Sequence, residues 1–104
     1  MMDKALLESA ARVAGIPGEY HEEWDAIVRS DECDQYNRGV LWRPHVDDAA
    51  TFRLAVTLRI ELGRAVAEQC HHPDVHELWQ KDEIAATRRA VLRSAAGMDR
   101  QAGK

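Results

Sequence analysis

Residues 39–48, GVLWRPHVDD, contain a change from strand to helix that decides how the rest of the chain is interpreted. The β-favouring run at 40–42 ends shortly before Pro44, which predicts a short strand centred on these residues. Asp47 and Asp48 follow, and either carboxylate can accept hydrogen bonds from the unpaired N–H groups of a first helical turn. This segment therefore predicts a strand that leads into a capped helix.

The helix that begins at Asp47 or Asp48 is apolar around much of its circumference. Phe52 and Val56 share one face, and Leu54 and Leu58 widen the apolar surface. Such a helix is expected to be covered on more than one side. We therefore expect it at the centre of the core.

The segment that follows this helix is ambiguous. Residues 66–70 and 75–79 can pair across a polar turn, which favours a β-hairpin near 64–80. The competing interpretation is one long helix from Asp48 to about Gln69, although Gly63 in its interior would cost about 1 kcal/mol relative to Ala.

Two further helices are predicted near the ends of the chain. The first begins at Asp3 as N-cap and ends at Gly15. The last begins at the cap Asp82 and ends at Gly97. The expected buried stripe of this helix consists of Ile84, Thr87, Val91 and Ala95. Arg89 and Arg93 are expected on the opposite face. The organisation expected from these boundaries is one domain over 1–97 and a flexible tail over 98–104.

The segment between the first helix and the strand is strongly acidic. Tyr20, Trp24, Ile27 and Val28 recur at helical spacing, which predicts one or two turns of helix, and residues 30–38 are typical of a loop. Aromatic side chains within a charged rim are also typical of protein interfaces. The candidate partner-binding residues are Tyr20, Glu22, Glu23, Trp24, Asp25, Asp31, Glu32 and Asp34.

Composition limits the class of protein. A chain of 104 residues fits one domain, and no apolar run approaches the roughly 20 residues of a membrane span. A net charge of −4 argues against general nucleic-acid binding, which needs a basic face. The start at 1–4 lacks a signal-peptide core, so we expect a cytoplasmic protein in which Cys33 and Cys70 are reduced.

Several segments resemble a family of small uncharacterised proteins of tailed phages and prophages, of the phage ABA-sandwich or NinX-like type. The similar segments are 41–48 (LWRPHVDD), 53–56 (RLAV), 6–16 (LLESAARVAGI) and 85–91 (AATRRAV). The resemblance implies a compact α+β fold with helices packed on a small antiparallel sheet, which supports the hairpin over the long helix. It also implies work inside an infected bacterium and transfers no catalytic residues.

No catalytic motif is complete. None of Ser9, Ser30 and Ser94 lies in a Gly-x-Ser-x-Gly elbow. Residues 21–25 begin like the His-Glu-x-x-His helix of zinc proteases but lack the second histidine. The sequence therefore favours a non-enzymatic accessory protein that binds a host or phage protein, for example as an antagonist of host defence of the anti-CRISPR kind. A homodimer is also conceivable, because the arginines of the last helix could pair with the acidic segment of a second copy.

The alternative hypothesis is a metal-binding or metal-stabilised regulator. Its candidate ligands are Cys70, His71, His72 and His76. Zinc is held by three or four such donors, and a turn can bring them together. The closely spaced ligand pairs of zinc fingers are missing, however, so a solvated polar turn is the competing interpretation.

Overall fold

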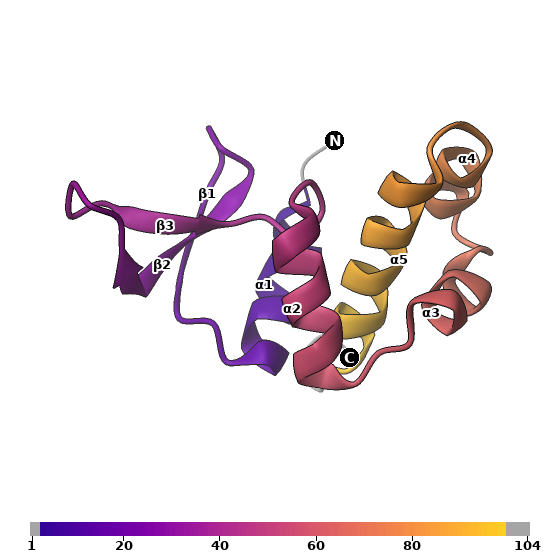
Figure 1. Cartoon of the computed structure of the whole chain (residues 1–104), viewed down its shortest axis with the longest axis horizontal. Coiled ribbons are helices and arrows are strands. Elements are labelled where there is room, and N and C mark those ends of the chain that lie inside the picture. The colour runs from indigo at the N-terminus through magenta and orange to yellow at the C-terminus, as the bar shows by residue number, and fades with distance from the viewer. Residues whose placement is uncertain (1–2, 100–104) are drawn as a thin grey trace.

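The computed structural model describes residues 3–99 and confirms an α+β fold. The described residues form a three-stranded antiparallel sheet at one end of the molecule and five α-helices beside it (Figure 1). The strands are β1 (Gly18–His21), β2 (Ala26–Cys33) and β3 (Gly39–Trp42). The helices are α1 (Lys4–Ala14), α2 (Asp48–Leu58), α3 (Leu62–Gln69), α4 (Pro73–Lys81) and α5 (Glu83–Gly97).

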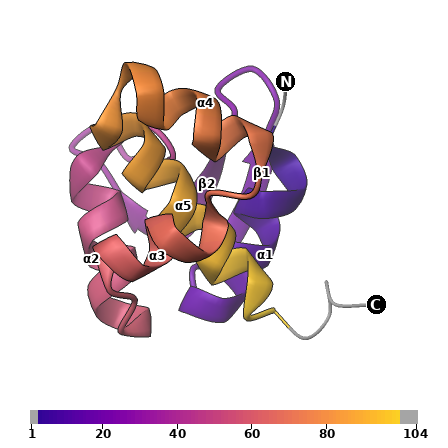
Figure 2. The same cartoon turned by 90° about the vertical axis from the view of Figure 1, so that its right-hand side faces the viewer.

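Helix α5 is the centre of the helical part. It packs against the other four helices, and Figure 2 shows it between α1 and α2 with α3 and α4 in front. Asp82 caps it as predicted, because its carboxylate accepts a hydrogen bond of 3.0 Å from the N–H of Ala85. Its buried residues are Ala86, Ala90, Val91, Leu92, Ala95 and Ala96. Since most of these are alanines, the neighbouring helices can approach closely.

The sequence prediction placed α2 at the centre of the core, and that is wrong. Helix α2 begins as expected, with the Asp47 carboxylate accepting a hydrogen bond from the N–H of Ala49. However, Phe52 and Val56 are 64% and 60% exposed, and only the opposite face, at Leu54 and its neighbours, is buried. Part of the apolar surface of α2 is therefore left in solvent.

The predicted faces of α5 are only partly correct. Val91 and Ala95 are buried as expected, but Ile84 is well exposed. Arg89 and Arg93, predicted on the exposed face, have side chains that are only 13% and 23% exposed. The reason is that α4 packs over this side of α5 and supplies a carboxylate to both arginines.

Residues 19–28 form a β-hairpin, so the helix predicted there is wrong. In the sheet, Ile27 of β2 lies opposite Tyr20 of β1 and Trp42 of β3. Such cross-strand packing stabilises a strand through distant partners, which local spacing does not reveal. Strand β2 also runs on to Cys33, so the predicted loop begins later than expected, whereas the strand predicted at 40–42 is confirmed.

Two glycines allow the outer strands to close on β2. A Cβ atom at Gly18 would overlap the carbonyl oxygen of Val28, and Gly18 has a φ of 151°. A Cβ atom at Gly39 would lie 2.6 Å from Cγ1 of Val28. The sheet therefore requires small residues on both sides of Val28.

Neither interpretation of the segment after α2 is correct. Arg59 adopts a left-handed conformation with φ of 57° and ends α2, which excludes the long helix. The predicted hairpin near 64–80 is replaced by α3 and α4, which bury Ala65 and Val75. Pro73 lies in the first turn of α4, where its missing N–H costs no helical hydrogen bond.

The C-terminal end of α5 is tied to α1. Helix α5 ends at Gly97 as predicted, but Met98 and Asp99 do not belong to a free tail. Asp99 is buried, and its Oδ2 accepts hydrogen bonds of 2.9 and 2.7 Å from Nε and NH2 of Arg12. The rest of the predicted tail, 100–104, lies outside the described residues.

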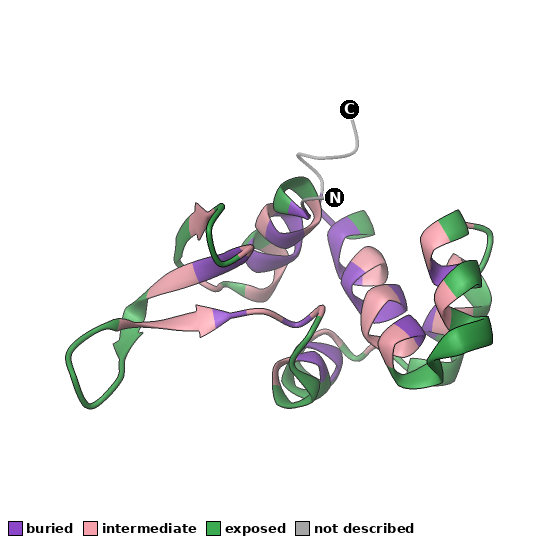
Figure 3. Ribbon diagram, turned by 90° about the horizontal axis from the view of Figure 1, so that it is seen from above, coloured by how far each residue is buried: buried purple, intermediate pink, exposed green. Residues whose placement is uncertain are grey.

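Buried residues lie in the helices and at the base of the sheet, whereas the tip of the sheet is exposed (Figure 3). The sheet therefore extends away from the helical part that holds the core.

Candidate functional site

Several large apolar side chains are exposed on the face formed by α2, α3, α4 and α5. Phe52 and Ile84 are 64% and 62% exposed, and Leu62 and Trp79 are 43% and 44% exposed. Single exposed apolar residues are common on soluble proteins, but a contiguous group is typical of an interaction site.

These side chains line two adjoining cavities that share Leu62 and Thr87. The first has a volume of about 390 Å³ and the second about 560 Å³. We call their combined lining the helical groove, which consists of Asp48, Thr51, Phe52, Leu62, Gly63, Val66, Ala67, Cys70, His76, Trp79, Ile84, Thr87 and Arg88. Because four helices contribute to it, the groove exists only once the helical part has folded.

The helical groove carries almost no free charge. Its charged residues are Asp48 and Arg88, and these form an ion pair with 2.6 Å between Oδ1 and NH1. Arg88 is held further by a hydrogen bond from Nε to the carbonyl oxygen of His45. The surface is therefore suited to apolar side chains rather than to a charged ligand.

Sequence reasoning did not identify this groove, although part of its signal was present. The apolar residues of α2 lie on more sides of the helix than its contact with the core covers. Phe52 is one of the apolar residues that remain exposed. The contributions of α3, α4 and α5 could not be recognised because α3 and α4 were interpreted as strands.

The predicted metal ligands are not brought together. Cys70 and His71 follow the end of α3, and Sγ of Cys70 and Nδ1 of His71 lie within hydrogen-bond distance of the carbonyl oxygens of Ala67 and Glu68 in that helix. His72 precedes α4, with its ring 4.2 Å from that of His71 between centroids. His76 lies further along α4, with Nε2 3.3 Å from the Gln80 amide. Within residues 3–99, these four side chains do not form a group with ligand atoms in metal-binding proximity.

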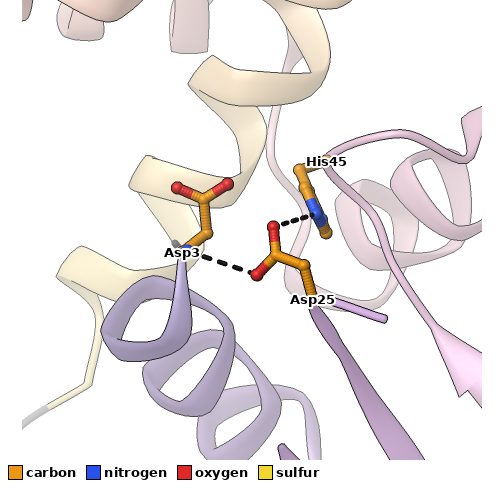
Figure 4. A group of neighbouring side chains, drawn as sticks. All are labelled: Asp3, Asp25 and His45. Atoms are coloured by element: carbon orange, nitrogen blue, oxygen red, sulfur yellow. Dashed lines mark hydrogen bonds and ion pairs between the residues drawn. The ribbon is translucent and has the colours of Figure 1, made fainter. Parts of the chain in front are cut away.

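A different trio, Asp3, Asp25 and His45, places one potential ligand atom each within 4.8 Å of the others (Figure 4). Asp25 is its centre, because its Oδ2 lies 3.2 Å from Nε2 of His45 and its Oδ1 accepts a hydrogen bond of 3.3 Å from the N–H of Asp3. The same Oδ1 accepts a hydrogen bond of 2.6 Å from the Tyr20 hydroxyl. Asp3 in turn pairs with Arg89 at 2.7 Å.

The electrostatics of this trio follow from its hydrogen bonds. Partial burial would raise the pKa of Asp25, but the hydrogen bonds from Tyr20 and from the Asp3 N–H outweigh that effect and lower the pKa. The same hydrogen bond to Asp25 raises the pKa of Tyr20 to about 12. The hydrogen bonds from the surrounding protein groups thus favour the ionised form of Asp25.

The trio does not have the surroundings of a metal centre. Both of its carboxylates already accept hydrogen bonds or ion pairs from protein donors. A histidine that binds metal normally donates its other N–H to an acceptor, whereas Nδ1 of His45 is buried without a partner among residues 3–99. We therefore interpret the trio as a junction that joins α1, the β1–β2 turn and the β3–α2 connection.

The predicted acidic binding surface is divided by the sheet. Tyr20 and Asp25 belong to the junction just described. At the other end of β2, Arg29 pairs with Asp31 and Glu32, and Arg38 pairs with Asp34. The remaining residues, Glu22, Glu23 and Trp24, form an exposed corner at the β1–β2 turn.

The chain matches no protein-family model, no curated protein and no solved structure. Among residues 3–99, none of the helices has the length and apolar character needed to cross a membrane.

Proposed function

We propose that this protein is a non-enzymatic binding protein that holds an apolar segment of another protein in the helical groove. The observation that carries the proposal is the contiguous exposure of Phe52, Leu62, Trp79 and Ile84 around two adjoining cavities. Aromatic residues at the centre of an apolar patch commonly supply most of the binding energy of an interface.

The two adjoining cavities between helices favour an amphipathic helix as the bound segment. Such a helix presents apolar residues at i, i+3, i+4 and i+7 along one face, which can occupy successive cavities. The two cavities that meet at Leu62 and Thr87 offer two successive positions of this kind.

The resemblance of four sequence segments to small phage proteins suggests the biological setting. On that basis we propose a phage- or prophage-encoded accessory protein that acts in the cytoplasm of the host cell on a host or phage protein. Antagonism of a host defence system is one form of this role. The exposed corner at Glu22, Glu23 and Trp24 would provide a second, acidic contact.

Capture of partners from a lysate of the proposed bacterial host tests the proposal. Three immobilised proteins are compared: the wild type, Phe52→Glu in the groove and Tyr36→Glu at the tip of the sheet. Tyr36 is a matched control because it is an aromatic residue of similar exposure, 67% against 64% for Phe52.

The expected result is a specific partner that the wild type and Tyr36→Glu retain and Phe52→Glu loses. A partner that binds all three proteins equally would show that the groove is not the binding site. In that case, reversal of Glu22 and Glu23 to lysine tests the acidic corner.

A further inference from the structure

Residues 18–25, which we call the strap, form β1 and the turn that leads into β2. None of these residues is fully buried, whereas Ala26 and Ile27, which follow directly, are 0% and 2% exposed. Strand β1 lies at an edge of the sheet and pairs with β2 over four residues. Edge segments that bury few apolar side chains are typical of the parts of a protein that open locally. The boundary between the strap and the core therefore lies at Asp25.

Asp25 connects the strap to the helical part through its side chain. Its Oδ1 accepts a hydrogen bond of 2.6 Å from the Tyr20 hydroxyl and one of 3.3 Å from the N–H of Asp3, which precedes α1. Its Oδ2 lies 3.2 Å from Nε2 of His45, in the connection before α2 (Figure 4). One carboxylate thus fixes the end of the strap to the segments that begin two helices.

The backbone at Asp25 also depends on these contacts. Asp25 has a left-handed conformation with φ of 45°, which residues other than glycine adopt mainly where their surroundings hold them. The N–H groups of Trp24 and Asp25 donate hydrogen bonds to the carbonyl oxygens of His21 and Glu22, so the turn closes on itself directly before the carboxylate. The exposed corner at Glu22, Glu23 and Trp24 lies within this turn, and its position therefore depends on Asp25.

We propose that the strap opens as a unit while the helices remain folded, and that Asp25 is the positioning residue that keeps it closed. In the closed state the acidic corner has a fixed place beside the starts of α1 and α2, and in the open state it is released from them. The inference is independent of the proposed binding in the helical groove, because no strap residue lines the groove.

Amide hydrogen exchange, followed residue by residue by NMR on the whole chain, tests the proposal. The amides of residues 19–25 are expected to exchange through a local opening that low concentrations of urea hardly affect, because this opening exposes little surface. The amides of α5 are expected to exchange through global unfolding, which urea promotes strongly.

Asp25→Asn removes the charge and keeps the backbone, because asparagine tolerates a left-handed conformation. Exchange of the strap amides is expected to accelerate about tenfold, since hydrogen bonds to a charged acceptor are stronger than those to a neutral one. Asp31→Asn is the matched control. It makes the same change on β2 outside the strap, at a carboxylate that pairs with Arg29, and should leave the strap amides unchanged.

Val75→Ala separates local opening from global unfolding. Val75 is completely buried in the helical part and remains buried when only the strap opens. This substitution is therefore expected to accelerate exchange of the α5 amides at least about tenfold without affecting the strap amides.

Two results would overturn the inference. Strap amides that accelerate together with those of α5 in Val75→Ala would show that the strap opens only when the whole chain unfolds. Strap amides that respond equally to Asp25→Asn and Asp31→Asn would show that Asp25 does not hold the strap. If Asp25→Asn does not fold, Tyr20→Phe takes its place, because it removes only the hydroxyl donor and keeps the ring that packs against the core.

Discussion

At the scale of single residues, Asp74 is the carboxylate that connects α4 to α5. It accepts hydrogen bonds from Nε of Arg89 and from Nε and NH2 of Arg93, at distances of 2.5 to 3.1 Å. Partial burial would raise the pKa of Asp74, but the hydrogen bonds from Arg93 and Arg89 outweigh it and lower the pKa to about 2. Asp74 therefore stays ionised when exposed carboxyl groups become protonated.

This contact predicts the effect of Asp74→Asn on stability and on its pH dependence. At pH 7 the substitution should lower the free energy of unfolding by about 2 kcal/mol, because the partly buried guanidinium group of Arg93 loses its anionic partner and that of Arg89 retains Asp3 but loses Asp74. Since the pKa is depressed in the folded state, the contribution is complete above the ordinary value of 3.8 and is lost as the pH falls toward about 2. Urea unfolding from pH 7 to pH 2 should therefore show that the free energy of unfolding decreases less for the variant than for the wild type.

Glu68→Gln provides the control, because Glu68 and Arg64 form an exposed pair on α3. Exposed pairs contribute at most about 1 kcal/mol. Equal destabilisation by the two substitutions would show that the ion pairs of Asp74 contribute no more to stability than an exposed ion pair does.

At the scale of elements, capping residues predicted the fold better than periodicity did. Asp47 and Asp82 correctly marked the beginnings of α2 and α5, because the N–H groups of a first turn need acceptors whatever the tertiary context. Helices α3 and α4 were missed because each is short and depends on packing against α5. The first hairpin was missed because Ile27 pairs with Tyr20 and Trp42 on the neighbouring strands, which the helical spacing of the apolar residues does not reveal.

The two faces of α4 predict different roles for two of its residues, one in stability and one in binding. Val75 is completely buried, so Val75→Ala should lower the free energy of unfolding by about 2 kcal/mol through the cavity it leaves. Trp79 is 44% exposed in the groove, so Trp79→Ala should cost less stability while it weakens capture of a partner. Urea unfolding of the two variants measures the loss of stability, and capture of partners by each variant measures the loss of binding. A larger loss of stability for Trp79→Ala than for Val75→Ala would contradict this assignment of faces.

At the scale of the whole molecule, the sheet lies at the opposite end from α3 and α4, which line the groove, in a body of 39 × 30 × 26 Å (Figure 1). The acidic segment was predicted to be a binding surface because its charged residues lie close together in the sequence. In three dimensions most of those charges are paired with arginines or belong to the junction at Asp25. The groove could not be predicted because its residues come from four helices that are brought together only by α5.

The whole molecule should also be stable without metal. The carboxylates of Asp3 and Asp25 accept hydrogen bonds or ion pairs from protein donors, and within residues 3–99 the side chains of Cys70, His71, His72 and His76 form no group with ligand atoms in metal-binding proximity. Removal of metal with a chelator should therefore leave the melting temperature unchanged. A decrease that added zinc reverses would restore the alternative hypothesis of a metal-stabilised regulator.

The central claim is that the helical groove is a protein-binding surface, and site-specific photo-crosslinking tests it most directly. A photoreactive phenylalanine analogue replaces Phe52 in one protein and Tyr36 in another, and both are irradiated in the host lysate. We predict adducts with another protein at position 52 that are much weaker at position 36. Adducts of equal yield at the two positions, or none at position 52, would contradict the claim.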